Sequence, residues 1–259
     1  MRFLKKIVDF YIESSIHVAF AVYCLMKITI FSNQLSSINH FSATVFFGTI
    51  LGYNFLKYYD VFKKGFFRSN RYFAIVVVCA LAGICFLISF WHLDFSIQIL
   101  LIVSGVFVVL YPFLRKYGWL KLFLVSFTVT FITVYIPFQC QKWFPSEFYI
   151  SFIQRFLLLT SLLIPFEIMD SKTDDTSLNT LPQLYGIDAV KLFGILLILP
   201  FMILEFLKSN PNFLVLPIAM ITILSIHFAD LKRTKYYTSF WVESVPILWW
   251  LIILFFLKY

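Results

Sequence analysis

Charged side chains are scarce in this chain of 259 residues. Asp, Glu, Lys and Arg together make up 13% of the sequence, whereas hydrophobic residues make up 61%. Soluble domains contain roughly 25% charged residues, so this composition excludes an ordinary water-soluble globular protein. The chain is therefore predicted to be an integral membrane protein.

Sequence patterns that bind nucleotides or zinc are also missing. The chain has no GxGxxG or P-loop motif, and its four cysteines show neither CxxC nor Cys/His ligand spacing. Three of these cysteines fall inside apolar runs and are interpreted as packing residues. The net charge of +8 does not indicate a nucleic-acid partner, because the basic residues lie between apolar runs and form no continuous patch.

Long apolar runs dominate the rest of the sequence. A membrane-spanning helix needs about 20 residues, and nine runs near this length occur at roughly 14–31, 41–58, 73–91, 96–114, 120–138, 151–169, 189–207, 213–230 and 240–257. The first run lacks a small-residue cleavage site, so it is interpreted as a span rather than a signal peptide. We expect an all-α integral membrane protein in which residues 1–259 form one bundle of nine transmembrane helices.

Basic residues indicate how this bundle is oriented. With the N-terminus in the cytoplasm, 16 of the 21 Lys and Arg residues fall on the cytoplasmic side, in agreement with the positive-inside rule. Four tryptophans fall at predicted span ends, where interfacial aromatic residues gather: Trp91, Trp119, Trp143 and Trp241. We expect a multi-pass protein of the bacterial inner membrane with a cytoplasmic N-terminus.

The most acidic stretch follows the sixth apolar run, on the predicted cytoplasmic side. It contains Glu167, Asp170, Asp174 and Asp175. On one continuing helix the first three acids lie within about 60° of one another, because their spacing is i, i+3, i+7. Such a face suits Mg²⁺, which takes one or two protein carboxylates together with water and substrate phosphates. The alternative is a solvated helix end whose acids face water.

Residues 167–186 resemble a family motif. They read E-x-x-D-x-x-x-D followed by T-L-P-x-x-x-G. This is similar to the second aspartate-rich motif of the UbiA family of intramembrane prenyltransferases, D-x-x-D-x-x-x-D followed by G-x-x-T-L-P-x-x-x-G. Here Glu167 replaces one aspartate, and the glycine before the T-L-P sequence is missing. Residues 111–116, Tyr-Pro-Phe-Leu-Arg-Lys, resemble the family's tyrosine followed by a basic pair.

The first aspartate-rich motif of the family, N-D-x-x-D-x-x-x-D, is degenerate in this chain. Asn54 matches, but Phe55, Tyr58 and Phe62 occupy the positions of the acids. Asp60 is no simple substitute, because on a helix it lies about 120° around from Asn54. In the family, two acid clusters hold Mg²⁺ ions on a prenyl diphosphate. The resemblance therefore implies a single Mg²⁺ ion here, with cationic side chains in place of the second.

The resemblance also implies roles for individual residues. Glu167, Asp170 and Asp174 would hold the Mg²⁺ ion, and Asp170 and Asp174 would act in catalysis. Five residues would bind the substrate: Asn54, Lys57, Tyr111, Arg115 and Lys116. Asn54, the three acids and Arg115 or Lys116 are expected to line one cavity open to the cytoplasm. For Lys57 taken alone, ordinary positive-inside topology is the preferred explanation.

Two functions from different classes follow from these residues. One is an enzyme that transfers a prenyl group from an isoprenoid diphosphate to a lipophilic acceptor such as a quinone precursor. The other is a noncatalytic descendant that binds an isoprenoid, a membrane lipid or a partner protein on the same scaffold. The degenerate first motif favours the second function, and the intact second motif favours the first. A transporter is a weaker third possibility, because no paired broken spans or repeat halves are recognised.

Other polar residues inside the runs have structural interpretations. His17 is preferred as a hydrogen-bonded packing residue, and Asp230, which shares a helix face with His227, as the partner of a neighbouring basic residue. Lining the cavity is the alternative for these three side chains. Glu205 and Lys208, spaced i, i+3, are expected to form a structural ion pair.

Overall fold

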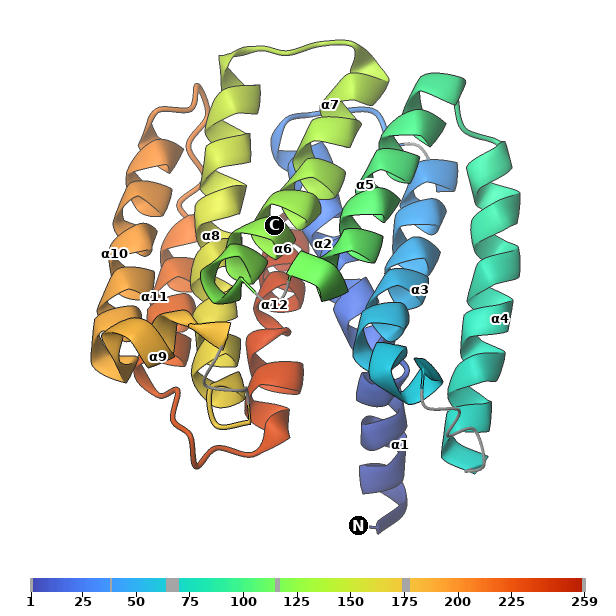
Figure 1. The fold of residues 1–259 in the computed structure, drawn as a ribbon. Helices are drawn as coiled ribbons and strands as arrows, with labels where there is room; N and C mark the ends of the chain where they lie inside the picture. The colour runs from blue at the N-terminus through green and yellow to red at the C-terminus, as the bar shows by residue number, and fades with distance from the viewer. Residues whose placement is uncertain (1, 38, 64–69, 115–116, 174–177, 258–259) are drawn as a thin grey trace.

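The computed structural model describes residues 2–37, 39–63, 70–114, 117–173 and 178–257, and within these ranges it contains helices and no strands. The main helices run roughly parallel to one another and form one bundle (Figure 1). Their bounds are α1 Arg2–Glu13, α2 Ile16–Ser32, α3 Asn39–Lys63, α4 Asn70–Trp91, α5 Phe95–Leu114, α6 Gly118–Thr130, η1 Phe131–Tyr135, α7 Ile136–Gln141, α8 Ser146–Asp170, α9 Leu181–Tyr185, α10 Ile187–Phe206, α11 Val215–His227, η3 Tyr237–Val242 and α12 Val245–Leu257. The expected all-α fold is confirmed.

Six helical segments of the described chain are long and apolar enough to cross a membrane: Tyr72–Trp91, Phe95–Leu114, Gly118–Gln141, Ser146–Asp170, Ile187–Phe206 and Tyr237–Phe256. A seventh is obtained if α1 and α2, which are bent by 61°, count as one span. Helix α3 has 25 residues but contains polar side chains such as Asn54 and Lys57, and α11 has only 13 residues. A helix of that length measures about 20 Å, shorter than the ~30 Å hydrocarbon layer. Each of the nine predicted runs thus lies mostly in helix, but nine spans are not confirmed.

Close helix packing is concentrated around α8. This helix packs against α10 and α6, whereas α3 packs against α4 and α2, and α2 also contacts α12. Gly194 of α10 lets α8 approach, because a Cβ atom at this position would lie 2.9 Å from Cγ1 of Ile164. Across the same contact, the Ser161 hydroxyl donates to the Gly194 carbonyl oxygen at 3.0 Å. Small residues and hydroxyl groups at close helix contacts are typical of membrane bundles.

Two of the predicted spans are interrupted by π-helical turns. The segment η1 joins α6 to α7, and η3 leads into α12. Pro137 and Pro246 follow these turns closely. Because proline has no backbone N–H group, the regular hydrogen-bond pattern of the helix cannot continue through it, and a π turn is one way to absorb the mismatch. The η3 turn ends directly before Glu243, an acid inside the last apolar run.

The sharp bend between α1 and α2 is held by α3. Ser15 at the bend has a left-handed φ of 62°, a conformation that costs a non-glycine residue about 1–3 kcal/mol. The Ser15 hydroxyl donates to Oδ1 of Asn54 at 2.7 Å, and Nδ2 of Asn54 donates to the Ser14 carbonyl oxygen at 2.9 Å. The Lys57 ammonium donates to the Ile12 carbonyl oxygen at 3.0 Å. Exposed backbone groups at the end of α1 are thereby satisfied inside the bundle.

The remaining polar residues that the sequence singled out have structural partners. Glu205 and Lys208 form the expected ion pair, with 2.7 Å between Oε2 and Nζ. His17 is buried, and its Nε2 atom lies 3.0 Å from the Phe240 carbonyl oxygen. Asp230 accepts a hydrogen bond from the backbone N–H of Lys232 at 2.8 Å through Oδ1. These contacts agree with packing and capping roles.

Replacing Asn54 with Ala is expected to destabilise the fold. The change leaves the Ser14 carbonyl and the Ser15 hydroxyl without their side-chain partner, and losing such buried bonds costs roughly 2–4 kcal/mol in total. Thermal unfolding of the detergent-purified protein measures the effect as a fall in melting temperature. Asn210→Ala, at an exposed position, is the control and should unfold like the original protein. Equal melting temperatures for the two variants would contradict the proposed role of the bend.

Candidate functional site

The bundle contains a large cavity of about 690 Å³. Its walls are formed mainly by apolar side chains of α2, α3, α5, α6 and α8, among them Leu25, Val45, Val108, Val125 and Leu159. Both Thr44 and Lys57 of α3 line it, so the cavity extends about 20 Å along this helix at 1.5 Å per residue. A cavity of this size is within the range of pockets that bury most of a small-molecule ligand.

Polar side chains gather at one end of the cavity, on the predicted cytoplasmic side. The residues concerned are Tyr53, Lys57, Tyr111, Lys121, Glu167, Asp170, Ser239 and Glu243. They belong to α3, α5, α6, α8, η3 and the junction between η3 and α12. We refer to this set as the polar mouth. Sequence analysis predicted four of its members: Lys57, Tyr111, Glu167 and Asp170.

Lys121 of α6 and Glu167 of α8 form a buried ion pair at the polar mouth. Their Nζ and Oε1 atoms are 3.1 Å apart, and the two side chains are only 4% and 7% exposed. Removing two charges from water is costly, so each group is stable here because the other is present. From the sequence, Lys121 is simply one of the 16 basic residues on the predicted cytoplasmic side. Its partner lies 46 positions away in the chain, which no local spacing reveals.

Asp170 lies one turn beyond Glu167, at the last position of α8. Unlike Glu167 it is exposed, and it also lines the cavity. The predicted side-by-side arrangement of the first two acids on one helix face is therefore found. The third predicted acid, Asp174, lies outside the described residues, as do Arg115 and Lys116.

A second set of polar side chains faces Asp170. It consists of Tyr53 of α3 and Glu243 at the junction between η3 and α12. The Tyr53 hydroxyl donates to Oε1 of Glu243 at 3.2 Å. Tyr53 also interacts electrostatically with Asp170 and Tyr111, and Glu243 interacts with Lys57. Glu243 was not predicted, although an acid within an apolar run is a recognisable signal of a functional or paired residue.

Lys57 has contacts in two directions. Its ammonium group bonds to the Ile12 and Glu13 carbonyl oxygens of α1 at 3.0 and 3.4 Å, and the side chain also lines the cavity. Carbonyl oxygens at a helix C-terminus carry partial negative charge, so the lysine stabilises the end of α1. From the sequence, the positive-inside rule was the preferred explanation for Lys57. In the structure Lys57 also lines the cavity at the polar mouth.

The expected placement of Asn54 is corrected by the structure. Asn54 is only 1% exposed, both ends of its amide bind the α1–α2 bend, and it is not among the residues that line the cavity. Its neighbours in the sequence, Tyr53 and Phe55, do line the cavity. Tyr58 donates its hydroxyl to the Glu13 carbonyl oxygen at 2.9 Å. The side chain of Asp60 is outside the described part of the structure.

The donors at the mouth fit Mg²⁺ only in a limited way. In the described residues there is no group of three or more His, Cys, Asp or Glu side chains that could enclose a metal ion. Glu167 pairs with Lys121, and Asp170 is the more exposed of the two carboxylates that line the cavity. This set fits an ion that takes one or two carboxylates and completes its coordination with water and substrate phosphates, as Mg²⁺ does.

The chemistry of the cavity selects its ligands. An apolar ligand body gains free energy when it leaves water for the walls, by roughly 25 cal/mol for each Å² of apolar surface buried. Lysine ammonium groups and tyrosine hydroxyls at the mouth can hydrogen-bond an anionic head group, and bonds that involve a charge are the stronger ones. The arrangement therefore suits an amphiphile with an anionic head and an apolar tail.

Comparison with known proteins identifies the fold. A scan against models of protein families finds no match, and a search of curated proteins finds none either. The chain is similar to the apo structure of a UbiA homolog from Aeropyrum pernix K1, with a TM-score of 0.66 and 14% sequence identity over 92% of this chain and 98% of that chain. The likeness agrees with the motif in residues 167–186, and the chain is accordingly a multi-pass membrane protein with the UbiA fold.

Proposed function

We propose that this protein is an intramembrane prenyltransferase that moves a prenyl group from an isoprenoid diphosphate to a lipophilic acceptor. The observation that carries the proposal is the continuity between an apolar cavity of about 690 Å³ and the polar mouth at its end. An isoprenoid diphosphate has the matching form, with a long apolar tail and a small head of high negative charge. The UbiA fold and the motif of residues 167–186 support the same class of reaction.

In this proposal the diphosphate lies at the polar mouth. Lys57 and Lys121 supply positive charge, and the Tyr111 hydroxyl supplies a further donor. Asp170, together with Glu167, would hold a single Mg²⁺ ion, which would supply positive charge against the diphosphate. Three sequence-predicted residues outside the described ranges complete the site: Arg115, Lys116 and Asp174.

The proposed transfer follows from where charge develops. The bond between the allylic carbon and the diphosphate oxygen breaks, and its electron pair leaves with the diphosphate. The acceptor forms the new bond to the prenyl carbon and loses a proton, which Glu243 receives in this proposal. Preorganised cations in a site with little water stabilise the negative charge that develops on the leaving group. Lys121 and Lys57 would supply here the charge that a second metal ion supplies in the family.

The proposal also includes a topology. Nine spans result if α2, α3 and α11 cross the membrane together with the six apolar segments. The N-terminus and the polar mouth would then face the cytoplasm, as the distribution of Lys and Arg predicts. The acceptor would be a molecule dissolved in the membrane, such as a quinone precursor of the inner membrane.

Asp170→Ala is expected to abolish the Mg²⁺ dependence of diphosphate binding. Isothermal titration of the detergent-purified protein with farnesyl diphosphate, with and without Mg²⁺, should show affinity at least tenfold higher with the metal. The variant should bind equally in both conditions, because Mg²⁺ needs charged oxygens to be retained. Asp188→Ala, an exposed acid outside the cavity, should behave like the original protein. If diphosphate binding changed neither with Mg²⁺ nor with the Asp170→Ala substitution, the proposed enzymatic function would be contradicted. A noncatalytic lipid-binding protein would then be the remaining interpretation.

The Lys121–Glu167 pair can be tested for stability and binding separately. Lys121→Met alone removes the ammonium group that pairs with the buried Glu167 carboxylate and is expected to destabilise the fold by about 3–5 kcal/mol. The double variant Lys121→Met/Glu167→Leu should recover most of this loss in a thermal melt. It should nevertheless bind farnesyl diphosphate at least tenfold more weakly, because a cation of the head-group site is gone.

The matched control for this test is the second buried pair, far from the mouth. Lys208→Met/Glu205→Leu removes an ion pair of similar burial at the C-terminal end of α10. This double variant should leave diphosphate affinity unchanged. If the Lys121/Glu167 double variant also kept its full affinity, Lys121 would have no part in binding the head group.

A further inference from the structure

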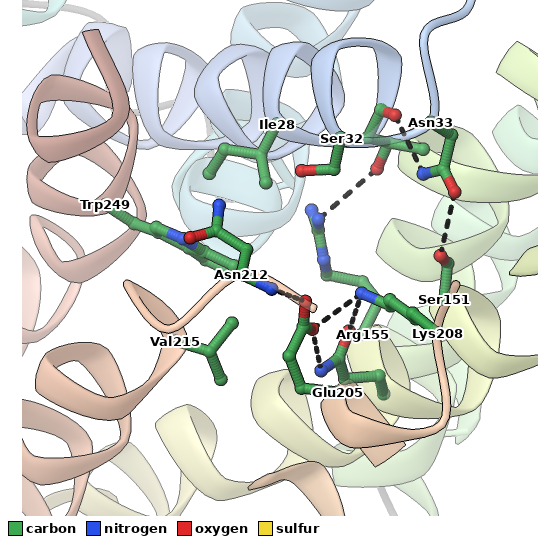
Figure 2. A pocket seen from close by; sticks show the side chains of 12 residues that line it. Ile28, Ser32, Asn33, Ser151, Arg155, Glu205, Lys208, Asn212, Val215 and Trp249 are labelled. Atoms are coloured by element: carbon green, nitrogen blue, oxygen red, sulfur yellow. Dashed lines mark hydrogen bonds and ion pairs between the residues drawn. The ribbon is translucent and has the colours of Figure 1, made fainter. Parts of the chain in front are cut away.

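A second, much smaller pocket lies at the end of the bundle opposite to the polar mouth. Its volume is about 20 Å³, and it shares no residue with the large cavity. It is formed between α2, α8, the end of α10, the chain leading into α11, and α12 (Figure 2). Arg155, which lines it, precedes Asp170 by fifteen residues of α8, so the two sites are about 22 Å apart along this helix.

Arg155 introduces a positive charge into this pocket. The residue is 5% exposed. One N–H group of its guanidinium donates to the Leu25 carbonyl oxygen at 2.7 Å, and another reaches the Thr29 hydroxyl at 3.3 Å. A guanidinium has five N–H donors, so others remain for a further acceptor. None of the ion pairs in the described part of the chain pairs a carboxylate with Arg155.

The nearby carboxylate of Glu205 is occupied by other groups. Its Oε2 atom accepts hydrogen bonds from Lys208 and Gln154, each at 2.7 Å, and its Oε1 atom accepts one from the backbone N–H of Asn212 at 2.8 Å. Figure 2 shows this cluster beside Arg155. Two cations and one carboxylate leave a net charge of +1 in the pocket. A buried charge without a counter-ion is unfavourable by several kcal/mol.

Trp249 provides a second, independent sign that an acceptor belongs here. Its ring lies under the Arg155 guanidinium, 5.4 Å from ring centre to Cζ, and it lines the same pocket. The residue is 4% exposed, and its indole N–H has no hydrogen-bond partner among the described residues. An indole N–H only donates, so the group that satisfies it must be an acceptor.

We propose that this pocket binds a chloride ion. Chloride accepts hydrogen bonds from the indole and from the spare guanidinium N–H groups, and it neutralises the excess charge, which a water molecule does not. The volume is that of about one water-sized particle, too small for the phosphate of a lipid head group. Access is from the predicted outer surface, because the rim includes the exposed residue Ser32. The ion would stabilise the packing of α2, α8 and α12 around Arg155 and Trp249.

The proposal is tested by thermal unfolding of the full chain in detergent, followed by circular dichroism. Sodium chloride or bromide replaces sodium gluconate at constant ionic strength. The melting temperature should rise saturably with either halide, because a ligand that binds only the folded state stabilises it. Trp249→Phe retains an aromatic ring and removes the N–H donor, so it should raise the half-saturating halide concentration about tenfold. Trp250→Phe, next in the chain but outside the pocket, should match the original protein.

Crystals of the original protein grown in bromide give a second readout that needs no variant. An anomalous peak between Arg155 and Trp249 is expected. Absence of this peak, or a half-saturating concentration unchanged by Trp249→Phe, would mean that the pocket holds water only and would overturn the proposal. A melting temperature that rises with phosphate instead of halide would overturn it in favour of a larger oxyanion. None of these outcomes depends on whether the protein binds a prenyl diphosphate.

Discussion

The cost of keeping charge out of water determines how this bundle is arranged. The clearest case is the ion pair between Lys121 and Glu167, which joins α6 to α8 at the polar mouth with both side chains almost fully buried. Neither residue is stable at this depth alone. The pair therefore fixes two helices relative to each other. Both Glu167 and Asp170 line the cavity, but Glu167 is buried in the ion pair whereas Asp170, one turn further on, is exposed.

The bend between α1 and α2 is subject to a similar constraint, because buried backbone polar groups also need partners. A chain that changes direction inside a bundle exposes carbonyl and N–H groups, and these need internal partners where water is absent. Asn54 and Lys57 of α3 donate to the carbonyl oxygens of Ser14 and Ile12, and Asn54 also accepts a hydrogen bond from the Ser15 hydroxyl. Asn54 is the residue that matches the family's first motif, so a position read as part of a substrate site serves the fold here. Lys57, one turn on, serves both the bend and the cavity.

The positions where the family has further acids have also acquired other contacts. Phe55 forms part of the cavity wall, and Tyr58 binds the last carbonyl of α1. Positive charge at the mouth comes instead from Lys57 and Lys121. In the proposed function direct ammonium contacts take the place of one of the two metal ions that would neutralise the diphosphate. The consequence is a site with fewer negative charges and a smaller demand for metal ions.

The sequence by itself determined the class, the helices and one end of the site. Apolar run length is set by bilayer thickness, and a helix satisfies its own backbone in lipid, so hydropathy alone located every long helix. The i, i+3 spacing of Glu167 and Asp170 was likewise enough to place them on one face of α8, because both lie within one helix.

Only the tertiary structure decided which polar groups meet. Lys121 forms an ion pair with Glu167, Tyr53 donates a hydrogen bond to Glu243, and Arg155 lies over the ring of Trp249. Each of these contacts joins segments that are far apart in the chain. Helical periodicity predicts the face on which a residue lies but not the helix that this face contacts. Asn54 matches the family motif, yet its side chain binds Ser14 and Ser15 at the α1–α2 bend. Hydropathy does not reveal this bend, because the bend depends on the left-handed backbone conformation of a single serine. Pairing between distant helices follows from how the whole bundle packs, and this is the information that a linear pattern does not contain.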